Sequence, residues 1–289
     1  MLKLPKSVNL TSAPIPNLVV KNALAEAVIC LQGAQVMHFA PAGQAPLLWA
    51  AERRHWIAGK NLRGGVPICW PWFGPHKTDA ALPQHGWVRQ REWQLIEACD
   101  LPDGRTQLAF TIVPEKELPE WPETLLVSLE VTIGKTLTLA LTTSNFGEEP
   151  VKFEDALHTY FAVSDVRGVG IRGFQGASYA DQLDGMKPQV ETADPAKISG
   201  PTCHIFSHRA PLYAIEDPAM NRRIAVEPTH SGSSVLWNPG EKTAASMVDL
   251  GEAWTKMVCL ETANCHAAAI TLAPGESHTT GVVYGAAAL

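Results

Sequence analysis

Four segments of the sequence combine ionisable side chains with tight-turn residues and aromatic rings. The first runs from Leu62 to His76 and contains Arg63, two adjacent glycines, three prolines and the rings of Trp70, Trp72 and Phe73. Adjacent glycines let a backbone approach a ligand closely, and an arginine offers a planar fork to a carboxylate or phosphate. The tryptophans are flat faces for a sugar ring, although burial against the core is the favoured interpretation for them. The segment predicts an ordered loop that lines a ligand site.

The second segment, Pro83 to Arg89, contains Gln84 and places His85 directly before a glycine. A histidine in this position has little steric cover from the backbone and is free to face a cavity. Arg89 follows His85 by four residues, so in an extended chain both side chains point to the same side. A surface strand with a solvated arginine is an equally good interpretation of this segment.

The third segment, Phe153 to Phe161, has the composition of a strand. Alternation then places Glu154, His158 and Tyr160 on one face, so that His158 is carried by a strand and not by a loose loop. An imidazole changes charge near neutral pH, which suits acid–base chemistry. A single histidine in a strand is, however, more often a hydrogen-bonded structural residue.

The fourth segment, Val258 to Asn264, ends an apolar run with Glu261. The carboxyl group is therefore expected in or beside the core, where burial raises its pKa towards values useful for a general base. The alternative interpretation is a buried glutamate bonded to a backbone turn.

Composition and missing motifs exclude several other functions. The chain has 289 residues, a formal net charge of −6 and no run of basic residues, which argues against nucleic acid or an anionic membrane as partner. The six cysteines form no CxxC pair, and no Walker-type, GxSxG, HxH or HExxH motif is present. The N-terminus lacks a signal peptide, and no apolar run approaches membrane length. We expect a soluble cytoplasmic protein with no cofactor and no metal.

Short runs of Val, Ile, Thr, Leu and aromatic residues, separated by Gly, Pro, Asn or Asp, recur along the sequence. Residues 125–133 and 136–143 flank Gly134-Lys135, which is a strong hairpin signal. Residues 256–261 and 267–272 are expected to pair around Asn264. Because strands follow one another without intervening helices, the sheets should be antiparallel. The fold class predicted is all-β, a large antiparallel β-sandwich with few short helices, formed by a single domain over residues 1–289.

Read together, the segments resemble the aldose 1-epimerase (galactose mutarotase-like) superfamily, and within it the hexose-6-phosphate mutarotases, or glucose-6-phosphate 1-epimerases. The matching stretches occur in family order over nearly the whole chain: residues 63–67, 70–75, 85–89, 156–161, 173–176 with Tyr179 and Asp181, 237–239 and 258–261. The resemblance implies a β-supersandwich fold and an isomerase that interconverts sugar anomers without metal or cofactor. It also implies a hexose 6-phosphate as small-molecule substrate, and we expect a monomer.

Roles for individual residues follow from the same resemblance. His158 resembles the catalytic general acid and Glu261 the general base. The substrate-binding residues implied are Arg63 and Arg89 for the 6-phosphate, Gln84 beside them, His85 for the sugar, and Asp181.

One segment departs from the family. Where the family usually supplies a substrate-binding carboxylate, residues 201–206 contain no acid, and Asp181 is followed by Gln182 where a lysine is common. Recognition of the sugar hydroxyls is therefore expected to differ. Two alternatives stay open, namely an epimerase of neutral aldoses and a carbohydrate-binding protein without catalysis.

Overall fold

The computed structural model describes residues 3–112 and 121–289. One of its two eight-stranded sheets, here called the outer sheet, is antiparallel. In spatial order its strands are β13 (Gly170–Arg172), β17 (Tyr213–Asp217), β18 (Arg222–Thr229), β22 (Ser277–Ala287), β9 (Leu137–Asn145), β8 (Leu125–Ile133), β7 (Thr106–Ile112) and β6 (Gln94–Asp100). The expected hairpin is confirmed, because β8 and β9 pair from Ile133 opposite Leu137 to Leu125 opposite Asn145.

A second sheet carries the pocket described below and is called the site sheet. Its order is β15 (Lys187–Val190), β14 (Ser178–Asp181), β16 (Thr202–Phe206), β19 (Ser233–Asn238), β20 (Met257–Asn264), β11 (Asp155–Leu157) and β5 (Ile68–Cys69), and β12 (Tyr160–Ala162) also pairs with β20. A third sheet contains β1 (Val8–Thr11), β2 (Asn17–Lys21), β3 (Ala25–Cys30) and β4 (Gln35–Pro41). A short pair joins β10 (Val151–Phe153) to β21 (Ile270–Leu272).

Helical structure is limited to short pieces. The described residues contain the five-residue α-helix α1 (Gly240–Ala244). The 3₁₀ turns are η1 (Arg53–His55), η2 (Val88–Gln90), η3 (Gln182–Asp184), η4 (Pro218–Met220), η5 (Gly251–Lys256) and η6 (His266–Ala268). No described helix is long and apolar enough to cross a membrane. The predicted fold class, an antiparallel all-β sandwich with few short helices, is confirmed.

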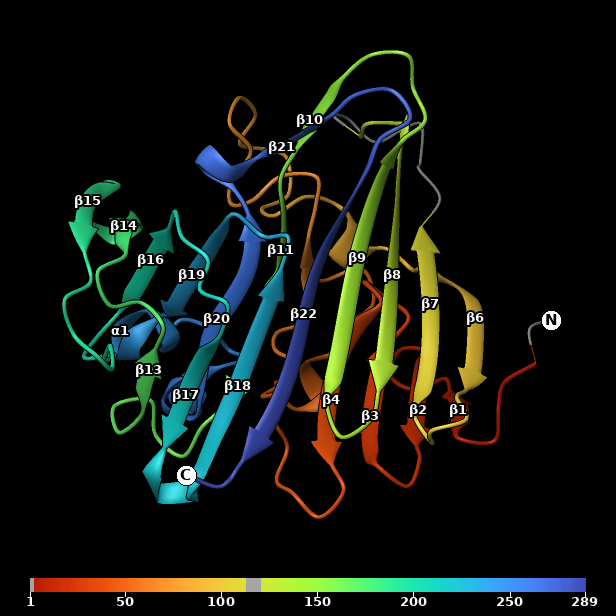
Figure 1. Cartoon of the computed structure of the whole chain (residues 1–289), viewed down its shortest axis with the longest axis horizontal. Helices are drawn as coiled ribbons and strands as arrows, with labels where there is room; N and C mark the ends of the chain where they lie inside the picture. The colour runs from red at the N-terminus through yellow and green to blue at the C-terminus, as the bar shows by residue number, and fades with distance from the viewer. Residues whose placement is uncertain (1–2, 113–120) are drawn as a thin grey trace.

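The outer sheet lies across both other large sheets (Figure 1). Strand β9 alternates between buried and partly exposed residues, as expected for a sheet with one face on the core. β20 differs, because all eight of its residues are buried. Val258 and Leu260 belong to the main core, whereas Cys259 and Ala263 belong to smaller clusters on the opposite face of the site sheet. The strand that carries Glu261 is therefore covered on both faces, which fixes its position.

Two local expectations were wrong. β20 does not pair with residues 267–272, because its partners are β19, β11 and β12, and β21 pairs with β10. The third segment is also not one continuous strand. It is interrupted at His158 and Thr159, between β11 and β12, where the N–H of His158 donates to the carbonyl oxygen of Pro67 at 2.9 Å. At this point the backbone of Pro67 takes the place of a partner strand. Pro67 belongs to the first segment, residues 62–76, which is called the glycine-rich loop below.

Candidate active site

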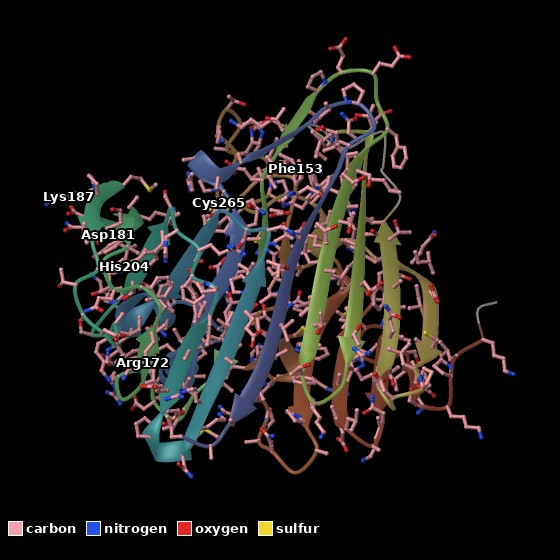
Figure 2. All side chains as sticks on the ribbon, in the orientation of Figure 1. Phe153, Arg172, Asp181, Lys187, His204 and Cys265 are labelled. Carbon is pink, nitrogen blue, oxygen red and sulfur yellow. The ribbon has the colours of Figure 1, made fainter. Side chains whose placement is uncertain are left out.

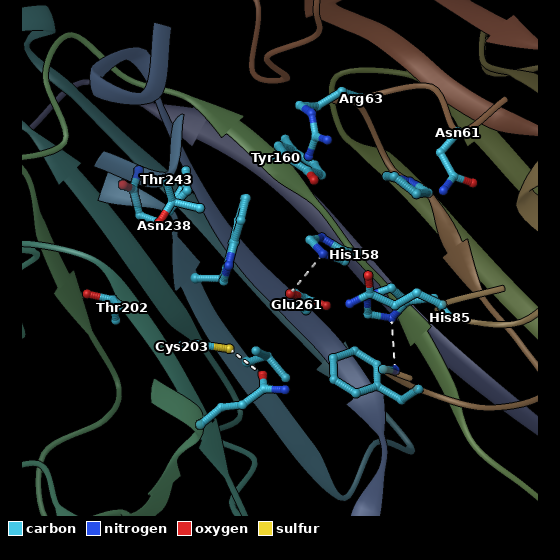
Figure 3. Close-up of a pocket in the computed structure, with 18 of the residues that line it drawn as sticks. Asn61, Arg63, His85, His158, Tyr160, Thr202, Cys203, Asn238, Thr243 and Glu261 are labelled. Atoms are coloured by element: carbon cyan, nitrogen blue, oxygen red, sulfur yellow. Dashed lines mark hydrogen bonds and ion pairs between the residues drawn. The ribbon is translucent and has the colours of Figure 1, made fainter. Parts of the chain in front are cut away.

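A cavity of about 330 Å³ opens on the site sheet (Figure 3). Its wall includes six of the seven residues that the sequence pointed to: Arg63, Gln84, His85, Arg89, His158 and Glu261. Ligand pockets of proteins begin at roughly 300 Å³, so the space suits a small molecule of sugar size. The structure therefore brings together side chains that are up to about two hundred positions apart in the chain.

The floor of the cavity is formed by cross-strand neighbours of β16, β19, β20 and β12. Cys203 lies opposite Trp237, which lies opposite Cys259, which in turn lies opposite Tyr160. In the adjacent row, Val235 lies opposite Glu261. Because side chains alternate between the faces of a strand, this register points Glu261 into the cavity with the apolar side chains around it.

The opposite wall comes from the glycine-rich loop and the Pro83–Arg89 segment. These two stretches are joined by backbone hydrogen bonds, including His85 N–H to Gly74 O at 2.7 Å. Gly86 allows the close approach, because its φ is +75° and a Cβ there would lie 1.9 Å from the carbonyl oxygen of Trp70. Trp70 is fully buried and Trp72 mostly buried, so the interpretation of the tryptophans as packing residues is confirmed. Phe73 is also mostly buried but lines the cavity.

His158 and Glu261 are adjacent at the bottom of the cavity. Nε2 of His158 lies 3.4 Å from Oε1 of Glu261. The other ring nitrogen, Nδ1, and the other carboxyl oxygen, Oε2, are buried and have no hydrogen-bond partner. Unpaired buried polar atoms are costly and are typical of sites that pair with a ligand. The ring of Tyr160 stacks on that of His158, with centroids 5.0 Å apart and planes 9° apart, which fixes the imidazole plane.

Burial displaces the pKa values of this pair in opposite directions. It raises the pKa of Glu261 well above its ordinary value, and the positive charge of Arg89 only partly offsets this effect. Burial, helped by the positive charge of Arg89, also lowers the pKa of His158 to about 3. Both effects favour the uncharged forms, so near neutral pH the pair holds a single proton. A pair with one proton contains both a donor and an acceptor for proton transfer.

His85 presents a defined donor to the same cavity. Its Nδ1 accepts the backbone N–H of Gly74 at 3.1 Å, and burial lowers its pKa well below the ordinary value. The neutral ring must therefore carry its proton on Nε2. Its centroid lies 5.6 Å from that of His158. We expected His85 and Arg89 to lie in one extended strand. They do not, because Arg89 lies in η2 and His85 has a φ of +66°.

The two arginines differ in their partners. Arg63 forms an ion pair with Asp249, with Nε 2.7 Å from Oδ1. Arg89 donates from Nη2 to the backbone oxygen of Gln84, and its Nε is buried without a hydrogen-bond partner. Burial lowers the pKa of Arg89 but leaves it protonated at neutral pH. The cavity therefore contains a cation with an unused donor, which suits an anionic ligand group.

Asp181 is not brought into the wall of the cavity. It pairs in register with His204, beside which it is labelled in Figure 2, and alternation along β16 puts His204 on the face opposite to that of Cys203. Its carboxylate instead accepts the N–H of Leu183 at 2.9 Å and so caps η3. The turn it stabilises carries Gln182 and Leu183, and both of these do line the cavity.

Sequence reasoning missed several residues of the wall. The segments discussed above include Tyr160, Trp237 and Cys203, but no spacing rule links these three residues to one another. Gln182 replaces a common lysine and accepts a hydrogen bond from the Cys203 thiol at 2.8 Å. Asp249 gave no signal, because 186 positions separate it from Arg63. Among residues 3–112 and 121–289, no three His, Cys, Asp or Glu side chains are grouped as a metal site requires.

Comparison with known proteins agrees with this geometry. The aldose 1-epimerase family model matches residues 16–285. A protein of Escherichia coli K12 named "Putative glucose-6-phosphate 1-epimerase" is 34% identical over 250 residues, which cover 85% of this chain and 82% of that protein. A Salmonella typhimurium protein of the same name is 32% identical over 85% of this chain and 82% of its own length.

Solved structures show the same fold. A "putative mutarotase" from Salmonella typhimurium superposes with a TM-score of 0.91 at 27% identity, covering 100% of this chain and 96% of that one. A galactose mutarotase related enzyme from Lactobacillus acidophilus has a TM-score of 0.76 at 14% identity, covers 94% of this chain and 97% of its own, and supports the fold alone. The chain therefore belongs to the aldose 1-epimerase family and is an isomerase of the epimerase type.

Proposed function

We propose that the protein interconverts the α and β anomers of glucose 6-phosphate. The observation that carries the proposal is the 3.4 Å contact between His158 and Glu261 in a cavity that Arg89 also lines. Two relatives named "Putative glucose-6-phosphate 1-epimerase", at 34% and 32% identity, support the same substrate.

The reaction needs one proton acceptor and one proton donor. In the reactive form, the one shared proton has passed from Glu261 to His158 across their 3.4 Å contact. Glu261 then takes the proton from the anomeric hydroxyl while His158 gives its proton to the ring oxygen, so that the C1–O5 bond breaks and C1 becomes a carbonyl carbon. Rotation about C1–C2 exposes the other face, and the two transfers then run in reverse. Because the pair ends each cycle with the proton count with which it began, either direction is catalysed. Two such groups, at about 10²–10⁴-fold each, supply the required acceleration.

The arginines hold the other end of the substrate. In this proposal Arg89 and Arg63, which both line the cavity, bind the 6-phosphate with charge-assisted hydrogen bonds, with Gln84 beside them. His85 offers Nε2–H to a sugar oxygen. Firm binding of the phosphate leaves C1 free to rotate after ring opening, which anomer exchange requires.

The direct test follows the conversion of freshly dissolved α-glucose 6-phosphate with an excess of a β-specific dehydrogenase, and α-glucose is measured in parallel. We expect acceleration of the phosphate ester and little of the free sugar. Arg89→Gln should reduce turnover of the ester at least tenfold more than that of glucose. Arg105→Gln is the control, because Arg105 is an exposed arginine paired with Asp103.

The other outcomes of this assay identify the alternatives. Acceleration of glucose alone would assign a neutral aldose as substrate, in agreement with the neutralisation of Arg63 by Asp249. If the chain binds glucose 6-phosphate but accelerates anomer exchange of neither the ester nor glucose, its role is carbohydrate binding.

A further inference from the structure

Asp249 is a residue of the cavity region to which neither the family motifs nor the sequence gave a role. Its carboxylate accepts the Nε–H of Arg63 at 2.7 Å, and the two side chains are only 23% and 25% exposed. Exposed ion pairs contribute little to the free energy of folding. A partly buried pair with a short charge-assisted hydrogen bond, in contrast, restricts the conformations of both side chains. Of the two, Arg63 lines the cavity and Asp249 does not.

The backbone around Asp249 is firmly held. The carbonyl oxygen of Met247 accepts the N–H groups of Leu250 and Gly251, at 3.0 and 2.9 Å, which closes a turn around Asp249. Leu250 is buried in one apolar cluster with Ala244, Met257, Cys259 and Tyr160. The carboxylate is therefore presented from a packed segment and not from a free loop.

Asn238, which precedes this segment in the chain, holds it in place through its side chain. Nδ2 of this side chain donates to the carbonyl oxygens of Trp254 and Met257, both at 2.9 Å, and Oδ1 accepts the N–H of Gly240. Asn238 is fully buried at the end of β19. The site sheet and the segment that carries Asp249 are consequently one packed unit.

Tyr160 lies beside the Arg63 guanidinium (Figure 3) and interacts with it. Burial alone lowers the pKa of Arg63, but interactions with Tyr160 and Asp249 outweigh it and keep the arginine charged. Asp249 occupies the Nε edge of the planar guanidinium, so the two terminal nitrogens are left for Tyr160 and for the cavity.

We infer that Asp249 is a positioning residue for the binding of the substrate phosphate. By accepting the Nε–H, the carboxylate holds Arg63 in the one orientation in which its terminal nitrogens face an anion in the cavity. The inference rests on the proposed function, since it takes the phosphate as the group that Arg63 binds. Asp249 itself does not touch the substrate.

The experiment compares Asp249→Ala with Asp249→Asn. The alanine removes the acceptor, whereas the asparagine retains an oxygen that can accept the Nε–H. For Asp249→Ala we expect the KM for α-glucose 6-phosphate and the inhibition constant of inorganic phosphate to rise about tenfold, with kcat within about twofold of wild type. Asp249→Asn should restore most of the affinity, and turnover of α-glucose should not change with either variant.

The matched control is Asp103→Ala, since Asp103 also accepts an arginine Nε–H at 2.7 Å but is exposed and remote from the cavity. Circular dichroism and thermal unfolding check that each variant is folded. An unchanged or lower KM for Asp249→Ala would overturn the inference, because the carboxylate would then have no effect on phosphate binding or would oppose it. Equal impairment of Asp249→Asn would also overturn it.

Arg63→Ala separates failure of the inference from failure of the proposed function. If this variant loses affinity for the phosphate ester and Asp249→Ala does not, only the positioning role is refuted. If Arg63→Ala affects the ester and glucose equally, the phosphate assignment itself is refuted.

Discussion

Glu261→Gln should separate catalysis from stability. Glu261 is only 2% exposed, and its Oε2 has no hydrogen-bond partner. Glutamine has nearly the same shape but cannot accept a proton, so the substitution removes the general base without opening a cavity. Loss of a general base reduces turnover by about 10²–10⁴-fold. This range corresponds to about 3–5 kcal/mol of transition-state stabilisation.

The same substitution should increase stability at neutral and alkaline pH. Because burial raises the pKa of Glu261 in the folded state, the folded protein retains this proton at pH values where the unfolded chain has lost it. The contribution of Glu261 to the free energy of unfolding therefore decreases as the pH rises from its ordinary pKa of 4.5 towards the raised folded value. Glutamine has no such dependence. At pH 8 we expect a gain of about 1–2 kcal/mol, or roughly 2–4 °C in Tm for each kcal/mol.

The two quantities are measured on the same preparations, by the coupled anomer assay and by thermal unfolding at pH 4.5 and pH 8. Glu130→Gln is the control, because Glu130 is an exposed glutamate on β8 of the outer sheet. A variant with near-wild-type turnover would remove Glu261 from the mechanism. A variant that loses stability more at pH 8 than at pH 4.5 would refute the argument that burial of this carboxyl is unfavourable.

Three further predictions follow from the same geometry. His158→Asn should reduce kcat by about 10²-fold or more while Tm changes little, since the loss is of a proton donor; turnover within a fewfold of wild type would exclude His158 as the acid. The imidazole of His158 should show no titration near its ordinary pKa of 6.5 in NMR spectra, because burial lowers its pKa to about 3; a His158 titration centred on pH 6.5 would contradict the single-proton pair. Gly86→Ala should destabilise the protein by about 3 kcal/mol in urea unfolding, because the new Cβ would lie 1.9 Å from a carbonyl oxygen. Gly176→Ala, which has a similar φ of +77° and open space around it, is the control and should cost about 1 kcal/mol; equal losses for the two variants would refute the steric explanation.

Local sequence determined much of the architecture. Runs of alternating residues with Gly134-Lys135 between them produced the β8–β9 hairpin, because a period of two and a short turn are both local properties. The same logic failed for β20. This strand is buried on both faces, so its pairing is decided by strands that pack against it from elsewhere in the chain. Asn264 illustrates the failure: it does not form a hairpin turn, and its side chain contacts Asp155 and Thr280.

The identities of the chemical groups were likewise readable from the sequence, whereas their partners were not. A histidine, a glutamate and two arginines in recognisable motifs predicted acid–base chemistry and an anionic ligand. The 3.4 Å contact between His158 and Glu261 depends on the register of β20 and on the break between β11 and β12. The difference between Arg63 and Arg89 depends on Asp249, which is 186 positions from Arg63 and is presented by a segment packed under Tyr160. Burial and long-range pairing set the charge states of these groups, and both arise only when distant strands come together.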